Sequence, residues 1–258
     1  MEDNVDTPKP EQRWLPLESN PEVSFHFPHG NEPTRGESPP LMLTSVITAL
    51  VHKLGVAEEW SYTDVYGLEP ELLAMVPQPV LAVLLLFPCS KNYEQFKIEE
   101  EARLTKLEQN ISPKVYFIKQ TIQNACGMMA LLHSIANNEK IVGPGILQKF
   151  IHKTKHLSPD ERAEFLENYT ELADAHSEGA QQGQTEAPNL EDDVDLHFVC
   201  FVEADHHIYE LDGRKSFPIN HGKCANLLEG SAKVIKHFME RDPDNLNFTV
   251  VALAPTLK

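Results

Sequence analysis

A cysteine and a glutamine six positions apart are the residues of this sequence best suited to chemistry. Cys126 follows the polar link TIQNA and opens an apolar helical pattern, CGMMALLHSIANN. At a helix N-terminus, unpaired N–H groups and the helix dipole favour a thiolate, so the pKa of this thiol is expected below the roughly 8.5 of a free cysteine. Gln120, across the turn, could donate to an oxyanion together with the Cys126 N–H, and Gly127 leaves room for a carbonyl. The alternative is that Cys126 is only a small apolar core residue.

A general base for this cysteine must come from the 12 histidines. His176 falls in a polar stretch and is expected to be solvated, whereas His133 lies two turns along the Cys126 helix, about 10 Å away, too far to take the proton directly. His197 differs because it lies in DLHFVCFV, where the following residues are all apolar. A histidine in such a strand needs a polar partner.

The hairpin that follows His197 offers that partner. A turn through Asp205-His206 puts Asp212 diagonal to His197 on the same face, and a turn through Ala204-Asp205 puts the two directly opposite. Both registers remain open. An aspartate that accepts the histidine N–H would fix its tautomer and stabilise the imidazolium. The alternative is a purely structural His–Asp pair.

The elements that must position these residues indicate one α/β (α+β) domain, with helices around a mainly antiparallel sheet. The segments 26–40 and 176–193 have few bulky apolar residues and predict two long loops. Helices are predicted over 41–56, 91–109, 126–138, from Ser158 to about Asn168, and over 226–242, and strands over 60–67, 79–88, 115–120, 195–213 (a hairpin) and 247–254.

Composition excludes several functions. The chain has 258 residues and a formal net charge of −17, so nucleic acid and membrane surfaces are poor partners and a basic protein or peptide is a natural one. Its four cysteines form no C-x-x-C pair, which fits reduced thiols and gives no zinc pattern. We expect a cytoplasmic monomer with no metal or cofactor.

At these residues the sequence resembles the ubiquitin carboxyl-terminal hydrolases of the UCH type, in particular their short single-domain L-three isozyme. The likeness runs from Gln12 almost to the C-terminus, through QRWLPLESNPEV, DVYGLEPELLAMVPQPVLAVLLLFP, VYFIKQTIQNACG, GQTEAP, DLHF, YELDGRKSFPINHG and FMERDPDNLNF. It implies a papain-like fold with a knotted backbone and a single catalytic domain over 12–258, and the polar residues 1–11 before that domain predict a disordered segment. It also implies a cysteine peptidase with Cys126 as nucleophile, His197 as proton donor and acceptor, Asp212 as orienting residue and Gln120 in the oxyanion hole.

The resemblance further implies ubiquitin as partner, a Nedd-type ubiquitin-like modifier as a second substrate, and a crossover loop that restricts the leaving group to small adducts and peptide tails. Two departures stand out: an insertion over 26–40, and Asp205-His206 where relatives commonly have Asp-Gly, so that a non-glycine residue needs a positive φ. A non-catalytic ubiquitin-binding protein and a general papain-like protease remain alternatives. The implied ubiquitin contacts are Pro16, Leu17, Glu18, Ser19, Asn20 and Pro21, then Ala180, Gln181, Gln182, Gly183, Gln184, Thr185, Glu186 and Ala187, and finally Asn245, Leu246, Asn247 and Phe248.

Overall fold

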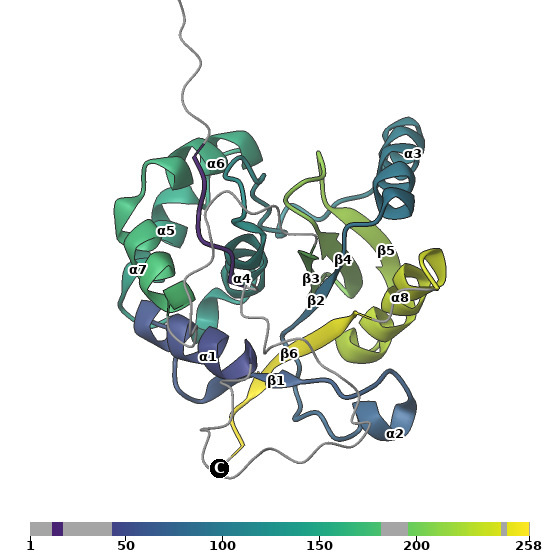
Figure 1. Cartoon of the computed structure of the whole chain (residues 1–258), viewed down its shortest axis with the longest axis horizontal. Coiled ribbons are helices and arrows are strands. Elements are labelled where there is room, and N and C mark those ends of the chain that lie inside the picture. The colour runs from purple at the N-terminus through teal and green to yellow at the C-terminus, as the bar shows by residue number, and fades with distance from the viewer. Residues whose placement is uncertain (1–11, 18–42, 182–195, 244–246, 258) are drawn as a thin grey trace, which may run out of the picture.

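A six-stranded antiparallel sheet forms the centre of the molecule, with helices on both faces (Figure 1). The structure, a computed structural model, describes residues 12–17, 43–181, 196–243 and 247–257. The elements are α1 (Leu43–Leu54), β1 (Trp60–Asp64), α2 (Pro70–Leu73), β2 (Ala82–Pro88), α3 (Lys91–Leu107), α4 (Cys126–Ala136), η2 (Glu139–Ile141), α5 (Ile146–Thr154), α6 (Pro159–Glu167), α7 (Thr170–Gln181), β3 (Leu196–Ala204), β4 (His207–Leu211), β5 (Ile219–Lys223), α8 (Leu227–Arg241) and β6 (Thr249–Pro255).

The strand order β1-β6-β2-β3-β4-β5 puts β2 and β3 at the centre of the sheet. Side chains of β2 alternate between two cores: Leu84 and Leu86 face a core with α1 and α4 to α7, whereas Leu85 and Phe87 face a core with α2, α3 and α8. Burial on both faces explains why the sequence of β2 is a continuous apolar run. The predicted α+β class and the predicted doubly covered strand are confirmed. The implied knot depends on the path of residues 182–195, which lie outside the described residues.

The hairpin of β3 and β4 turns through Asp205-His206, because Ala204 pairs with His207 and Cys200 with Leu211. The turn through Ala204-Asp205 is therefore wrong. Both turn residues have positive φ, 50° at Asp205 and 63° at His206, as the twist of a two-residue hairpin requires. Asp205 is held there by the Ser112 hydroxyl, 2.6 Å from its Oδ2.

The prediction of a strand over 115–120 is wrong, because no neighbouring strand among the described residues pairs with this backbone and side chains satisfy much of it. Tyr116 N–H donates to Asn137 Oδ1, and Asn137 Nδ2 donates to Tyr116 O, each over 2.8 Å. Further along, Arg162 donates to Phe117 O over 2.8 Å. The segment is thus extended and buried, as its apolar residues indicate, but it is anchored to the helices on either side of it.

The predicted loop over 176–193 begins too early, because α7 continues to Gln181. Four buried residues, Leu172, Ala175, His176 and Ala180, recur at helical spacing and face the core. Two of these are alanines and one is a histidine, so the apolar pattern is weak in the sequence. The remainder of that loop and the insertion over 26–40 lie outside the described residues.

Candidate active site

Cys126 is the first residue of α4, and its side chain is almost completely buried, at 5% exposure. The preceding N-cap residue is Ala125, which has no polar side chain with which to cap the helix. The first-turn N–H groups therefore keep their partial positive charge close to the thiol, which favours the thiolate. The predicted helix start at the cysteine is confirmed.

The direction of α4 follows from contacts at its far end. Asn138 Nδ2, just beyond the helix, donates to Leu81 O at the beginning of β2 over 3.0 Å. Since α4 packs against β2 and β3, and β3 runs antiparallel to β2, the Cys126 end of the helix points toward the beginning of β3. His197 is the second residue of β3. β3 is not yet paired with β4 at His197, because the pairing between these strands begins only at Cys200.

His197 and Asp212 form the pair that the hairpin register predicts. His197 Nε2 lies 2.7 Å from Asp212 Oδ1, and both side chains are buried, at 2% and 0% exposure. A carboxylate only accepts hydrogen bonds, so Nε2 carries the hydrogen. Nδ1 of His197 is then the basic nitrogen. The contact is confirmed, whereas its catalytic role remains a prediction.

Three donors hold the Asp212 carboxylate. Besides His197, the Arg214 N–H donates to Oδ1 over 2.9 Å, and the Tyr93 hydroxyl donates to Oδ2 over 2.5 Å. Burial alone would raise the pKa of Asp212, but the charge and hydrogen bond of His197, the charge of Lys215 and the Tyr93 hydroxyl outweigh burial and lower it. Asp212 is therefore an anion that can stabilise an imidazolium at His197.

Gln120 lies against the turn that carries Asp212. Its backbone N–H donates to Gly213 O over 2.8 Å, and a Cβ on Gly213 would come within 3.0 Å of the Gln120 Cβ, so this close approach requires glycine. Gln120 Nε2 donates to Ile122 O over 3.1 Å, which uses one of its two hydrogens and identifies this atom as nitrogen. The second N–H remains to serve an oxyanion.

The N-terminal segment 12–17 is bound to the loop before Cys126. Trp14 N–H donates to Gln123 O, and Gln123 N–H donates to Gln12 O, each over 3.0 Å. Leu17 packs on the first turn of α4, because a Cβ on Gly127 would lie 3.0 Å from its Cδ1. The missing side chain of Gly127 therefore accommodates Leu17, which corrects the expectation that this space serves a substrate carbonyl.

The residues implied as ubiquitin contacts differ in exposure. Pro16, Leu17 and Ala180 are buried, so none of these side chains offers a surface in this conformation. Asn247 is exposed and Phe248 is partly buried against the core around α8. Gln181 ends α7. The other implied contacts, over 18–21, 182–187 and 245–246, lie outside the described residues.

Sequence reasoning missed the groups that surround Asp212, namely Tyr93, Arg214 and Lys215. Tyr93 lies within a charged helical stretch of the sequence. An aromatic residue in such a stretch indicates only that its ring is buried, and gives no indication of what its hydroxyl contacts. Lys215 is 2% exposed, although its sequence neighbours are those of a surface turn. Neither pattern distinguishes these residues from ordinary surface positions.

Two buried histidines hold the segments around the site. His133 Nε2 lies 3.0 Å from Ile118 O, and His176, which was expected to be solvated, places its Nε2 2.6 Å from Leu15 O. Burial lowers the pKa of each to about 4 from an ordinary 6.5. The unfolded chain binds these protons more readily than the folded chain. The contribution of the two histidines to the free energy of unfolding is therefore fully present above pH 6.5 and is lost as pH falls toward 4.

We expect each of these histidines to remove about 2 kcal/mol from the free energy of unfolding between pH 7 and pH 5. Urea unfolding at both pH values measures the loss. His176→Gln keeps a donor for Leu15 O but cannot titrate, so its loss should be about half that of the two histidines together. Equal stability at pH 7 and pH 5 would contradict the neutral, buried state of both rings.

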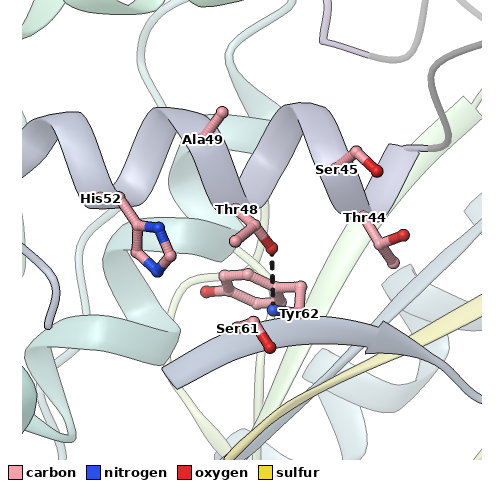
Figure 2. Close-up of a pocket in the computed structure, with 7 residues that line it drawn as sticks. All are labelled: Thr44, Ser45, Thr48, Ala49, His52, Ser61 and Tyr62. Carbon is pink, nitrogen blue, oxygen red and sulfur yellow. Dashed lines mark hydrogen bonds between the residues drawn. The ribbon is translucent and has the colours of Figure 1, made fainter. Parts of the chain in front are cut away.

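A pocket of about 400 Å³ lies between α1 and β1 (Figure 2). Its polar groups join the two elements: Thr48 Oγ1 accepts from Tyr62 N over 3.0 Å, and His52 Nε2 lies 2.8 Å from Trp60 O. None of its lining residues belongs to the group around Cys126, His197 and Asp212. Within the described part of the chain, no three metal-ligating side chains gather at one point, and no helix is long and apolar enough to cross a membrane.

Comparisons with known proteins show which family this chain resembles. The model of a family described as ubiquitin carboxyl-terminal hydrolase, family 1, matches residues 41–240. A ubiquitin carboxyl-terminal hydrolase of Drosophila melanogaster is 43% identical over 243 residues, which cover 93% of this chain and 96% of the relative. The isozyme L1 of Rattus norvegicus is 42% identical over 219 residues, which cover 83% of this chain and 94% of the relative.

Solved structures extend the likeness to the fold. The crystal structure of the Trichinella spiralis UCH37 catalytic domain bound to ubiquitin vinyl methyl ester superposes with a TM-score of 0.63 at 23% sequence identity. The match covers 83% of this chain and 93% of that domain.

Proposed function

The chain belongs to family 1 of the ubiquitin carboxyl-terminal hydrolases, a family of cysteine peptidases, and on this premise we propose that it acts through Cys126, His197, Asp212 and Gln120. The substrate is ubiquitin that carries a small adduct or a peptide tail on its terminal glycine. The observation that supports this assignment best is the buried 2.7 Å hydrogen bond between His197 and Asp212, at the strand end toward which the Cys126 helix points.

The proposed reaction begins with proton transfer from the Cys126 thiol to His197 Nδ1. The thiolate attacks the carbonyl carbon of the terminal glycine, and the oxyanion accepts hydrogen bonds from the Cys126 N–H and the second N–H of Gln120 Nε2. Asp212 stabilises the imidazolium that has formed. Collapse of the intermediate breaks the bond to the adduct, and the His197 imidazolium protonates the departing amine.

Hydrolysis of the thioester completes the cycle. Neutral His197 takes a proton from water, the hydroxide adds to the thioester carbonyl, and the Cys126 thiolate leaves. Ubiquitin departs with a free carboxylate. Every proton in this scheme passes through one ring nitrogen, Nδ1, because Nε2 is bound to Asp212 throughout.

Three finer features belong to the same proposal. Within the family, the motifs of the sequence favour kinship with the short L-three isozyme. A Nedd-type modifier is a second substrate, and the leaving group is restricted to small adducts and peptide tails. The exposed Asn247 and partly buried Phe248 are the described residues available to contact the modifier.

Hydrolysis of ubiquitin aminomethylcoumarin by the wild type and by Cys126→Ser tests the function. The wild type should turn over and Cys126→Ser should lose activity, whereas the matched control Cys224→Ser, at a partly exposed cysteine, should keep it. Binding of ubiquitin without turnover would instead identify a ubiquitin-sequestering protein. Cleavage of unfolded casein would identify a general papain-like protease.

The net charge of −17 predicts a salt dependence. Because the C-terminal tail of ubiquitin is basic, long-range attraction should raise its rate of association with this chain. Between 20 and 200 mM NaCl, kcat/KM should fall by about 3- to 10-fold while kcat changes little, since salt screens the encounter rather than the chemistry. Initial rates at low and at saturating substrate separate the two parameters. A kcat/KM independent of ionic strength would limit the charge to a role in solubility.

A further inference from the structure

One face of α3 is bonded to the turn that carries Asp212. Tyr93 and Glu100 are the buried residues of this helix, so an apolar stripe cannot be what holds it in place. Four of its side chains, spaced so that they share one side of the helix, each bond to a residue of the segment 212–216. The bonds join Tyr93 Oη to Asp212 Oδ2 over 2.5 Å, Glu94 to Arg214 over 2.5 Å, Glu100 to Lys215 over 2.8 Å, and Glu101 to the Ser216 N–H over 2.6 Å.

The pair of Glu100 and Lys215 fixes the position of the helix along the turn. Lys215 Nζ lies 2.8 Å from Glu100 Oε2 and 2.5 Å from Glu210 Oε1, with both carboxylates buried. Burial alone would lower the pKa of Lys215, but the two carboxylates raise it, so the amine stays charged. A buried charge tolerates few other arrangements of its partners, and α3 is therefore fixed in one register against residues 212–216.

Tyr93 is the member of this face that reaches the catalytic pair. Its ring lies 4.7 Å from that of Phe87 and 6.4 Å from that of His197, measured between centroids, within the same aromatic cluster. Burial and the nearby Asp212 charge raise the pKa of Tyr93 well above its ordinary value, so the hydroxyl remains a donor at every working pH. His197 and Arg214 bond to Oδ1, whereas Tyr93 bonds to Oδ2 and so stops the carboxylate from rotating.

We propose that Tyr93 is a positioning residue that aims the Asp212 carboxylate at His197, and that α3 is the arm that holds Tyr93 in place. The proposal rests on the function proposed above. Tyr93 touches neither the thiol nor the scissile bond in that scheme, so it acts on the reaction only through Asp212. Its loss should therefore slow the chemical step and leave the binding of ubiquitin unchanged.

Tyr93→Phe removes only the hydroxyl, and Tyr62→Phe is its matched control. Tyr62 is also buried, and its hydroxyl lies 2.5 Å from Ser134 Oγ, far along α4 from Cys126. Both variants should lose some thermal stability, because Asp212 Oδ2 loses its donor in Tyr93→Phe and, among the described residues, Ser134 Oγ keeps only its bond to Leu131 O in Tyr62→Phe. Only Tyr93→Phe should lower kcat, by about 10-fold, with KM within about 2-fold of the wild type. Equal kcat values for the two variants would overturn the proposal.

The second readout is the pH dependence of Cys126 alkylation by iodoacetamide, followed on the Cys126 peptide by mass spectrometry. The titratable and charged groups that face Asp212 are His197 on β3, Tyr93 on α3, His133 on α4, and Arg214 and Lys215 on the same turn. Tyr93→Phe changes only one of these groups. A less firmly held Asp212 stabilises the imidazolium less, so the midpoint should move upward by about half a pH unit. An unmoved midpoint would overturn the proposal. This readout needs no ubiquitin, so a wild type without turnover would contradict the proposed function alone.

Glu101→Ala provides a variant at the far end of the same face. It removes an exposed acceptor of the Ser216 N–H, which loosens the contact of α3 with residues 212–216 without removing any buried side chain. We expect a fall in kcat of about 2- to 5-fold, in the same direction as Tyr93→Phe. If Tyr93→Phe fails to fold, Glu101→Ala tests the proposal in its place. A fall in kcat of about 2- to 5-fold would support α3 as the arm that holds Tyr93, and a kcat equal to that of the wild type would contradict it.

Discussion

Replacing Asp212 by alanine should lower kcat/KM for ubiquitin aminomethylcoumarin by about 10³- to 10⁴-fold, whereas asparagine should cost about 10- to 100-fold, the equivalent of one charge-assisted hydrogen bond. Alanine leaves three buried donors, from His197, Arg214 and Tyr93, without their acceptor. Asparagine can keep its carbonyl oxygen at Oδ1, because two N–H donors point there. It therefore preserves the orientation of His197, but it loses the charge that stabilises the imidazolium and places an N–H2 group against the Tyr93 hydroxyl.

Comparison of kcat/KM for Asp212→Ala and Asp212→Asn separates the effect of orienting His197 from the effect of the negative charge. Asp205→Asn provides a matched control, since Asp205 is a hairpin residue that pairs with Lys114 and Ser112 and should leave kcat/KM within about 2-fold. Melting curves would establish that each variant is folded at the assay temperature. An Asp212→Ala enzyme whose kcat/KM lies within about 10-fold of the wild type would contradict a catalytic role for Asp212. Equal losses of kcat/KM in Asp212→Ala and Asp212→Asn would contradict the claim that Asp212 orients His197.

Gln120→Ala should lower kcat by about 100- to 1,000-fold with KM nearly unchanged. The second N–H of Gln120 Nε2 would meet a full negative charge only after the thiolate has attacked, so its loss affects the transition state more than the bound substrate. Steady-state kinetics with ubiquitin aminomethylcoumarin separate the two constants. Gln120→Glu removes the same donor at the same size and should be at least as inactive.

Gln95→Ala is the control for this pair of variants, because Gln95 is exposed on α3 and bonds only to Glu99 among the described residues. Its kinetics should match those of the wild type. A Gln120→Ala enzyme whose loss lies entirely in KM would show that Gln120 binds substrate without stabilising the oxyanion.

The contact between His197 and Asp212 could be predicted from sequence because its geometry is local. His197 is polar in an apolar strand, and a two-residue hairpin returns the chain so that Asp212 lies on the same face within a few ångströms. The start of α4 at Cys126 and its end at two asparagines were predictable for the same reason. Asn137 and Asn138 donate to the His133 and Ser134 carbonyls over 2.7 and 2.8 Å, as residues at a helix C-terminus do.

The failures share a cause, which is dependence on partners distant in sequence. Residues 115–120 have the composition of a strand, yet their partners are His133, Asn137 and Arg162, whose roles no local pattern reveals. The sequence INHGK of β5 lacks a regular alternation and was not predicted as a strand. Tyr93 belongs to this class as well, because it meets Asp212 across 119 positions of the chain.

The central claim, that Cys126 is the nucleophile toward the C-terminus of ubiquitin, is tested most directly with ubiquitin vinyl methyl ester. Intact mass and peptide mapping after incubation should show one ubiquitin per chain, attached at Cys126, in the wild type and in Cys224→Ser. Cys126→Ser should gain none. Absence of the adduct in the folded wild type, or its attachment at Cys89, Cys200 or Cys224, would contradict the claim.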